Sequence, residues 1–565
     1  MLYPKTNKSH NVFCLNGIWH FQTVSDDYCF GLPLRNYSLM AVPASMNELV
    51  SDVETQNHVG LCVYEREFSV PLCEDNEYRL RIGAASHKCK VYLNGEIIGE
   101  GASGFLPIDL PLKNIKESNR LTIAIDNRLT AETLPAGRLK NGKQAIKFDF
   151  YNFTGIHRDV MIYSRPKNHI NDISVKTVVD GDYGKIKIDV DTNCESVSFD
   201  IFDKDKKIVA SSNDTIIMID EPRLWSPDDP YLYTLVVRTE SDEYEERFGI
   251  RKIEVKGDKL LLNDKPIYLK GFGMHEDFFL LGKGNSSAVN IRNFELLKWI
   301  GANSVRTSHY PYSEEFMDLA DEYGILVVDE VPCVGMNWWD NNFGGEDGVN
   351  DVTLNLHKKL ISDLYARDKN HPCVIMMSVA NEAATNEEAS DVYFKEVIQH
   401  AKNVWDVPVT IVEFYGAEET RASKYVDVLS INRYFGWYYD HGDLSVIKDQ
   451  MVSELNKWHD IYGKPILVAE FGADTIEGLH ALPAETFSEE FQREYVAENC
   501  KAFDLCDFCI GEHVWNFADF KTKQGVNRIR GNRKGVFTKD RQPKAVAYFI
   551  KQRWNEKISY QKHLK

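Results

Sequence analysis

Two glutamates late in the chain have the type and surroundings that acid–base chemistry on a sugar requires. Glu382 closes the segment 378–382, and Glu470 follows the apolar run 466–469. We therefore expect each carboxylate at the end of a buried strand. Hydrolysis of a glycosidic bond by double displacement needs one carboxyl group to protonate the leaving oxygen and a second to attack the sugar carbon. Either glutamate taken alone is more simply explained as a loop salt bridge or a cap.

A repeated unit from about Lys265 to the C-terminus strengthens the functional interpretation. In each repeat a short apolar strand ends in polar residues and is followed by a stretch with apolar side chains three and four residues apart, as at Phe294, Leu297 and Ile300. Eight such units predict a (β/α)8 TIM barrel, whose active site forms at the C-terminal strand ends. The predicted strands are 267–274, 304–308, 325–330, 374–380, 409–414, 428–432, 466–470 and 509–515.

Other polar and aromatic residues follow the same strand ends. Sugars favour such a mixture, because hydroxyls need hydrogen-bonding groups and the ring faces pack on aromatic side chains. Two simpler alternatives stand beside this: Arg306 as the partner of a nearby carboxylate, and Trp515 as a core side chain. The residues at these strand ends include His275, Arg306, His309, Asn432, Tyr434 and Trp515.

Two long stretches resemble the signatures of glycoside hydrolase family 2. They cover residues 303–311 with 321–328, and residues 368–374 running on to 381–382. The resemblance implies that Glu382 is the general acid/base, that Asn381 bonds the sugar 2-hydroxyl and that Glu470 is the nucleophile. The chain departs from the family pattern in two places, because Ala383 replaces the common proline and Met377 replaces the common tryptophan before the serine. These departures concern the shape of the loop and not the carboxylate.

Within that family, the C-terminal stretch resembles the β-glucuronidases, whose Asn-x-Lys motif binds the C6 carboxylate of the sugar. Asn532 and Lys534 match this motif, and Arg528 lies in the same segment. Residues 521–540 hold seven basic residues and one acidic residue in a chain of formal net charge −19, which favours a local anion site. A basic surface turn is the simpler alternative. The segment 429–438 also resembles the β-glucuronidase pattern, which places Asn432, Tyr434 and Tyr438 at the sugar pocket.

The N-terminal half predicts two all-β domains. Residues 11–165 contain short alternating segments with turns such as Asn94-Gly95, a pattern typical of an antiparallel sandwich, and the resemblance identifies it as a jelly-roll sugar-binding domain. Residues 166–257 predict an immunoglobulin-like sandwich. The expected domains are therefore 1–165, 166–262 and the catalytic barrel 263–565. Asp149 begins a stretch that resembles one reaching the barrel mouth, so it is a candidate sugar ligand, with a turn-capping role as the alternative.

Composition excludes several other classes of protein. With 565 residues, 43% of them hydrophobic, the chain is long enough for about three domains. No apolar run approaches the roughly 18 residues of a membrane span, and no basic stripe predicts nucleic-acid binding. Eleven scattered cysteines and an N-terminus without a secretory apolar region predict a cytoplasmic protein. The pair Cys506 and Cys509 has no second pair to complete a zinc site, so we interpret it as core.

The combined interpretation is a retaining, exo-acting enzyme that hydrolyses small-molecule or oligosaccharide β-glucuronides. Retention requires the two carboxyl groups to lie about 5 to 5.5 Å apart, and the charge of Glu470 is expected to keep Glu382 protonated. We expect no cofactor and no metal, because His275 and His309 have no third ligand nearby, and His309 is expected to bond a sugar hydroxyl. Family relatives are often tetramers, so a homo-oligomer is expected.

Two alternatives stay open from the sequence. The first is another activity of the same family, namely β-galactosidase, β-mannosidase or β-galacturonidase, and the second is a non-catalytic carbohydrate-binding protein. The loop after the third strand carries Trp338 and Trp339, which either stack on the aglycone or pack the loop.

Overall fold

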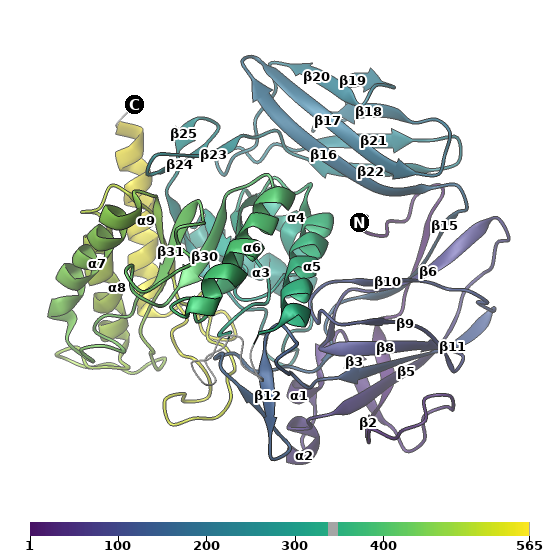
Figure 1. Ribbon diagram of the computed structural model, residues 1–565, viewed down its shortest axis with the longest axis horizontal. Coiled ribbons are helices and arrows are strands. Elements are labelled where there is room, and N and C mark those ends of the chain that lie inside the picture. Colours follow the sequence, from purple (N-terminus) through teal and green to yellow (C-terminus); the bar gives the residue numbers. More distant parts are fainter. Residues whose placement is uncertain (337–348, 564–565) are drawn as a thin grey trace.

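A closed barrel of eight parallel strands forms the C-terminal part of the molecule, beside two β-sandwich domains (Figure 1). The computed structural model describes residues 1–336 and 349–563. The strands of the barrel pair in sequence order, and the last closes against the first. The expected fold class, a jelly roll, an immunoglobulin-like sandwich and a TIM barrel, is confirmed.

The barrel strands are buried on both faces, which is why they read in the sequence as continuous apolar runs. All eight predicted strands are present, with ends that differ by no more than two residues. They are β26 (Leu269–Gly273), β27 (Ser304–Arg306), β28 (Leu326–Glu330), β29 (Val374–Asn381), β30 (Val409–Glu413), β31 (Val428–Asn432), β32 (Ile466–Phe471) and β33 (Cys509–Val514). The helices that follow are α3 (Ser287–Ile300), α4 (Glu314–Tyr323), α5 (Asp351–Asp368), α6 (Glu388–Val404), α7 (Ile447–Tyr462), α8 (Glu489–Phe503) and α9 (Ala545–His563).

Helix α4 shows how local sequence fixes where a helix begins and ends, and so where the next strand, β28, begins. The Ser313 side chain accepts a hydrogen bond from the backbone N–H of Phe316 at 3.2 Å, which is the usual N-cap arrangement. Gly324 ends the helix with a φ of 70°, a conformation that favours glycine. A Cβ at Gly324 would also lie 2.8 Å from the Pro227 carbonyl oxygen. The turn into β28 therefore needs glycine both for its backbone angle and for the close approach of the preceding domain.

The N-terminal domain is a sandwich of two antiparallel sheets. A segment near its end leaves the sandwich and crosses to the barrel, where Phe150 forms a bridge with Thr522 and the Tyr151 N–H donates to the Lys521 carbonyl at 2.9 Å. This crossing brings Asp149 to the barrel mouth. One sheet contains β3 (Ser38–Val42), β2 (Gly17–Val24), β5 (Leu61–Ser69), β11 (Ser118–Asp126), β8 (Lys88–Leu93) and β9 (Glu96–Gly101), and the other β1 (Asn11–Cys14), β15 (Val160–Pro166), β6 (Asn76–Ile82) and β10 (Ile108–Pro111).

The second domain is a smaller sandwich with its own apolar core. Its hairpin between β16 and β17 turns at the Asp180–Tyr183 pair, as the glycine-containing turn in the sequence predicts. One sheet contains β16 (Ile170–Asp180), β17 (Tyr183–Thr192) and β20 (Ile216–Asp220), and the other β19 (Ile208–Ser212), β18 (Ser198–Phe202), β21 (Tyr233–Arg238) and β22 (Glu243–Phe248).

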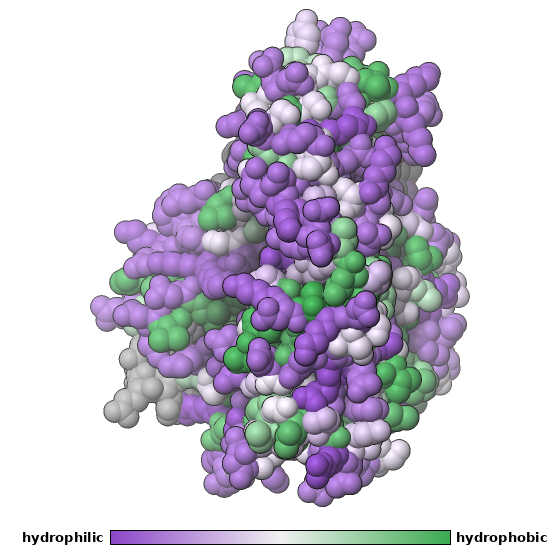
Figure 2. Space-filling view, turned by 90° about the vertical axis from the view of Figure 1, so that its right-hand side faces the viewer, coloured by the Kyte–Doolittle hydropathy of each residue, from purple (hydrophilic) through white to green (hydrophobic). Residues whose placement is uncertain are grey.

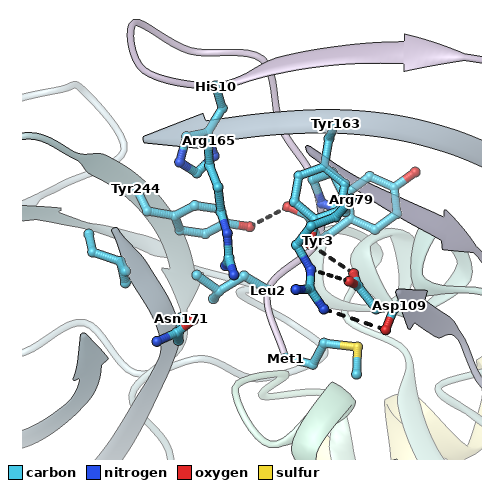
Figure 3. Close-up of a pocket in the computed structure, with 12 residues that line it drawn as sticks. Met1, Leu2, Tyr3, His10, Arg79, Asp109, Tyr163, Arg165, Asn171 and Tyr244 are labelled. Carbon is cyan, nitrogen blue, oxygen red and sulfur yellow. Dashed lines mark hydrogen bonds and ion pairs between the residues drawn. The ribbon is translucent and has the colours of Figure 1, made fainter. Parts of the chain in front are cut away.

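The first residues of the chain pass between these domains and the barrel (Figure 1). The Met1 ammonium group lies 2.7 Å from an Asp172 carboxylate oxygen of the second domain. The Tyr244 hydroxyl donates to the Tyr3 carbonyl at 2.7 Å, beside a cavity of about 190 Å³ (Figure 3). The N-terminal segment therefore lies at the junction between the two sandwiches and lines the cavity there.

Seen from the side of the β-sandwich domains, the surface is largely hydrophilic with several separate hydrophobic groups (Figure 2). Within residues 1–336 and 349–563, none of the helices combines the length and the apolar character that crossing a membrane requires. Cys506 and Cys509 are both buried and neither takes part in a disulfide bond, as the core interpretation of this pair predicted.

Candidate active site

The two glutamates lie at the C-terminal ends of strands four and seven of the barrel, β29 and β32. Glu470 lies within β32 and is buried, and Glu382 directly follows β29. Asn432 connects them, because its Nδ2 donates to Glu382 Oε1 at 2.7 Å and its Cα is the register partner of Glu470. The structure thus brings the two carboxylates to one region of the barrel mouth, as the strand assignment predicted.

Both carboxylate oxygens of Glu470 are held by donors. Arg306 Nη2 donates to Oε1 at 2.5 Å, and the Tyr434 hydroxyl donates to Oε2 at 2.6 Å. A carboxylate gripped at both oxygens keeps one orientation, which an attacking nucleophile needs. Tyr434 was predicted at the sugar pocket, and its hydroxyl contacts the predicted nucleophile itself.

Glu382 has a different electrostatic environment. Its pKa is raised to about 7, first by burial and next by the nearby charge of Glu470, against the opposing effects of Asn432 and Arg306. A carboxyl group with such a pKa is protonated over much of the range below neutral pH. In a pair of catalytic carboxyl groups, the one whose pKa is raised by its environment acts as the acid. Here that group is Glu382.

Arg306 occupies a fully buried ion-pair cluster beneath the carboxylates. Its Nη1 lies 3.0 Å from both carboxylate oxygens of Glu330, so the carboxylate-partner interpretation of Arg306 is the one the structure shows. His309 Nδ1 bonds Glu330 at 2.8 Å, and the ring stacks on Trp515 with centroids 5.2 Å apart. Burial alone would raise the pKa of Glu330, but Arg306 and His309 outweigh it and lower that pKa. The cluster places a cation beside Glu470.

Asn381 and Trp515 complete the mouth around the carboxylates. Asn381 Oδ1 accepts from Asn432 Nδ2 at 3.2 Å and from Arg306 Nη1 at 3.3 Å. Trp515 directly follows β33 and is buried, and the Arg306 guanidinium lies 5.8 Å from the centre of its ring. Both side chains therefore pack against the cluster that holds Glu470.

A second group of polar residues lies beside this centre. Lys534 Nζ contacts Asp474 Oδ2 and donates to the Tyr438 hydroxyl at 2.9 Å. Asn532 Nδ2 donates to Asp149 Oδ2 at 2.8 Å. The Tyr438 ring packs 5.0 Å from the ring of Tyr434, which itself bonds Glu470, so the two groups are neighbours.

Arg528 joins this second group. Its Nε lies 3.0 Å from each carboxylate oxygen of Asp149, and its Nη2 donates to the Tyr438 hydroxyl at 2.8 Å. Asp149 comes from the N-terminal domain, whereas the others come from the barrel. The residues predicted to bind the substrate from this side of the pocket are therefore joined in one hydrogen-bond network: Asp149, Tyr438, Arg528, Asn532 and Lys534.

Most cations in residues 521–540 have carboxylate partners from other parts of the chain. Counting charges along the sequence indicated an excess of positive charge, and this inference was incomplete. Lys534, which pairs with Asp474, is distinct because its side chain is fully buried, whereas the other cations pair nearer the surface. The pairs, with their shortest N–O distances, are Lys521 with Glu48 at 2.7 Å, Arg528 with Asp149 at 3.0 Å, Arg533 with Asp519 at 3.1 Å and Lys539 with Asp277 at 2.8 Å.

Sequence reasoning assigned no role to three carboxylates around the site. Glu330 closes the predicted third strand, so its position at a strand end was a usable signal. Asp474 lies four residues after Glu470, and its pKa falls because Lys534 and Arg528 outweigh the effect of its burial. Glu413 closes β30 and is buried among hydroxyl groups. The partners of Asp474 and Glu413 are distant in sequence or lie in loops, so spacing did not reveal them.

One group in the described residues has the composition of a metal site. Asp321, His371 and Cys373 offer ligand atoms within 4.8 Å of one another. They lie before the first residue of β29, at the end of the barrel opposite Glu382. Asp321 already accepts hydrogen bonds from His371 Nδ1 at 2.6 Å and from the Cys373 backbone N–H at 2.9 Å. The arrangement is that of an ion pair supporting the start of β29. The prediction for Trp338 and Trp339 lies outside the described residues.

Comparison with known proteins gives a consistent result over the whole chain. Residues 15–166 match the family described as "Glycosyl hydrolases family 2, sugar binding domain", residues 168–251 match "Glycosyl hydrolases family 2", and residues 253–558 match "Glycosyl hydrolases family 2, TIM barrel domain". A curated relative, "Beta-glucuronidase" of Paenibacillus borealis, is 39% identical over the full length of both chains.

Solved structures of the same kind superpose closely. A β-glucuronidase from an uncultured Clostridium sp. matches with a TM-score of 0.96 and 45% identity, covering 98% of this chain and 100% of its own. The β-glucuronidase from Ruminococcus gnavus in complex with D-glucuronic acid matches with a TM-score of 0.92 and 36% identity, covering 98% and 99%.

Proposed function

This chain belongs to glycosyl hydrolase family 2, and we propose that it is a retaining, exo-acting β-glucuronidase. The observation that carries the proposal is the arrangement at the barrel mouth, where Glu382 and Glu470 lie beside a buried lysine and asparagine, Lys534 and Asn532. The first pair supplies the chemistry of glycoside hydrolysis, and the second supplies donors for a carboxylate.

The mechanism uses the two glutamates in sequence. Glu470, oriented by Arg306 and Tyr434, attacks the anomeric carbon while Glu382 protonates the departing oxygen. The alcohol leaves, and a glycosyl ester on Glu470 remains. Glu382, now a carboxylate, accepts a proton from water as the water attacks the anomeric carbon, and glucuronate is released with its original configuration. With a pKa of about 7, Glu382 can donate a proton in the first step and accept one in the second.

Substrate selection rests on the group around Lys534. Its ammonium and the Asn532 amide are proposed to bind the C6 carboxylate, with Tyr438 and Arg528 beside them. The Lys534 ammonium group contacts Asp474, and this carboxylate compensates its buried charge. Asp149 is proposed to contact a sugar hydroxyl, and the names of the curated relatives and the Ruminococcus gnavus complex support a glucuronide as the substrate.

The remaining predicted positions are proposed to line the same pocket. Asn381 bonds the sugar 2-hydroxyl, His309 bonds another hydroxyl, and Trp515 offers a ring face. Asn432 holds Glu382 through its amide. A non-catalytic carbohydrate-binding protein would have no need for a carboxyl pair in which one pKa is raised and the other group is gripped by two donors, so this alternative is less well supported.

A panel of aryl β-glycosides that differ only in the sugar tests the substrate assignment. The glucuronide is expected to have the highest kcat/KM, because its carboxylate meets Lys534 and Asn532. The galacturonide measures the contribution of the 4-hydroxyl, while the glucoside, galactoside and mannoside lack the carboxylate. A preference for any neutral sugar would transfer the assignment to another activity of the family.

Two broader properties complete the proposal. A cytoplasmic location is supported by the cysteines, since none of the eleven, all of which lie within the described residues, takes part in a disulfide bond, and thiols persist in reducing compartments. A homo-oligomer, such as a tetramer, is supported by apolar side chains exposed on the second domain, where Val178, Ile216 and Met218 are each about half exposed. Light scattering coupled to size-exclusion chromatography measures the mass, and a monomer of 64.9 kDa would contradict this proposal.

A further inference from the structure

Glu413 lies at the end of β30, next to the strand that carries Glu382, and takes no part in the mechanism above. Its side chain is buried, with 1% of the residue exposed. Three hydroxyl groups donate to its carboxylate: Thr385 to Oε2 at 2.6 Å, Thr420 to Oε1 at 2.5 Å and Ser423 to Oε1 at 3.0 Å. A buried carboxylate is costly to maintain without such partners, and these three donors hold the Glu413 side chain in one orientation.

The Thr385 hydroxyl connects this carboxylate to the loop of the acid/base residue. Only Ala383 and Ala384 separate Thr385 from Glu382. Thr385 is fully buried, and its carbonyl accepts from the Arg421 backbone N–H at 2.9 Å. The hydrogen bond to Glu413 therefore fixes the loop three residues beyond the reacting carboxyl group.

The loop needs such an anchor because the backbone of Glu382 has an unfavourable conformation. Glu382 has a φ of 50°, in a region that residues with a side chain seldom adopt and that surrounding contacts must enforce. On its N-terminal side, the Glu382 N–H donates to the Val412 carbonyl at 2.8 Å. On its C-terminal side stands Ala383, which has no ring to restrict φ as a proline would. Two hydrogen bonds restrain the loop on that side: the Ala384 N–H donates to the Met336 carbonyl at 3.1 Å, and the Thr385 hydroxyl donates to Glu413 at 2.6 Å, the one of the two made by a side chain of the loop.

We propose that Glu413, acting through the Thr385 hydroxyl, is a positioning residue that holds the Glu382 carboxyl group in line with the leaving oxygen. This inference rests on the proposed acid/base role of Glu382. Glu413 does not touch the substrate. Loss of its hold on Thr385 changes the placement of Glu382, while Glu470 keeps its own contacts with Arg306 and Tyr434.

Two matched substitutions test the inference, because each removes one hydroxyl donor from the same carboxylate. Thr385→Val loses the bond on the acid/base loop, and Thr420→Val loses a bond on the segment after β30. Both threonines are buried, so both variants are expected to lower the melting temperature similarly. Only Thr385→Val is expected to disturb proton donation by Glu382.

The readout is kcat/KM on an alkyl glucuronide, which needs the acid, and on a 4-nitrophenyl glucuronide, which needs it little. A misplacement of about 1 Å can cost about a hundredfold in rate, so we expect Thr385→Val to lose roughly tenfold on the alkyl substrate and less than about twofold on the aryl one. Thr420→Val is expected to stay within about twofold on both. Thr385→Ser retains a hydroxyl and is expected to restore the alkyl activity.

Glu382→Gln, measured beside these variants, distinguishes a failure of the proposed acid/base role of Glu382 from a failure of the positioning role of Glu413. If Glu382→Gln itself loses equal activity on both substrates, the proposed role of Glu382 fails. If Glu382→Gln is selective but Thr385→Val loses both activities equally, or Thr420→Val is equally selective, the positioning role of Glu413 is overturned. Should Thr385→Val not fold, Thr385→Ala provides the same comparison with a smaller side chain.

Discussion

The carboxylate centre and the lysine group beside it are built in different ways. Glu470, Arg306 and Asn432 come from strands of one barrel, and each is buried and held by hydrogen bonds to its neighbours. Lys534 and Asn532 come from an irregular segment after the last strand, and Asn532 bonds Asp149 from another domain. Strand ends give the reacting groups fixed positions, whereas the groups proposed to select the substrate depend on loops and on a domain contact.

This difference predicts that the two regions can be disrupted independently. Substitutions at the carboxylate centre should lower kcat/KM for every substrate, or by an amount that depends on the leaving group. Substitutions at the lysine group should lower kcat/KM by an amount that depends on the sugar.

The largest effect is expected from Glu470→Ala. Without the nucleophile no glycosyl ester forms, and turnover should fall by a factor on the order of 10⁴ or more. Added azide is expected to restore part of the activity by entering from the vacated side, giving an α-linked glycosyl azide, which nuclear magnetic resonance identifies. A β-linked product, or near-normal activity, would reassign the nucleophile.

Glu382→Gln should have an effect that depends on the leaving group. General acid catalysis contributes roughly 10² to 10⁴ in rate, and a poor leaving group needs most of it. We expect alkyl or steroid glucuronides to lose far more kcat/KM than activated aryl glucuronides. Equal losses on both substrates would show that Glu382 is not the proton donor.

Lys534→Ala should distinguish substrates by their sugar. A hydrogen bond to a charged group is worth roughly 1.5 to 3 kcal/mol, and about 1.4 kcal/mol corresponds to tenfold. We therefore expect kcat/KM for an aryl glucuronide to fall by roughly ten- to a hundredfold or more, while the matching glucoside changes little. Asn532→Ala should act in the same direction with a smaller effect, because a neutral amide bonds a carboxylate more weakly.

Lys523→Ala provides a matched control for Lys534→Ala. It removes the same charge from the same segment, but Lys523 is exposed, and its ammonium nitrogen lies 3.5 Å from the Ile146 carbonyl oxygen. Its kinetics are expected to match the wild type on both sugars. If Lys534→Ala lowers both substrates equally, the segment has a structural role and the glucuronide assignment loses its main support.

The smallest of these effects is the pH dependence near neutrality. Glu382 donates a proton only when protonated, and its pKa is about 7. The kcat/KM for an alkyl glucuronide should therefore be level just below pH 7 and fall about tenfold for each unit above it. Glu382→Gln should lack this basic limb. A limb that persists in the variant would assign it to another group.

The barrel was predictable because its signal is local. Each strand forms a short apolar run, and its end is marked by polar residues such as Glu330, Asn432 or Glu470. Once eight strands were ordered, their C-terminal ends had to meet at one mouth. The roles of Glu382, Asn381 and Lys534 came from the family resemblance and not from spacing, and they remain predictions.

The electrostatics of the site was less predictable, because it depends on contacts across the chain. The positive charge counted in residues 521–540 is largely compensated by Glu48, Asp149 and other distant acids. Asp474 and Glu413 received no role, since their importance arises from Lys534 and Thr385, which join them only in the folded protein. Sequence patterns located the reacting groups together with Arg306, Asn432 and Tyr434, which hold them, and assigned no role to Glu330, Asp474 and Glu413.

The proposal that Glu470 forms a covalent glycosyl intermediate is tested most directly by trapping it. The enzyme is incubated with a 2-deoxy-2-fluoro-β-glucuronide carrying an activated leaving group, then digested, and the peptides are sequenced by mass spectrometry. We expect one fluoroglucuronyl group on the peptide that contains Glu470, and none in the Glu470→Ala variant. An adduct on a different residue, or no adduct while the compound is hydrolysed, would contradict the mechanism.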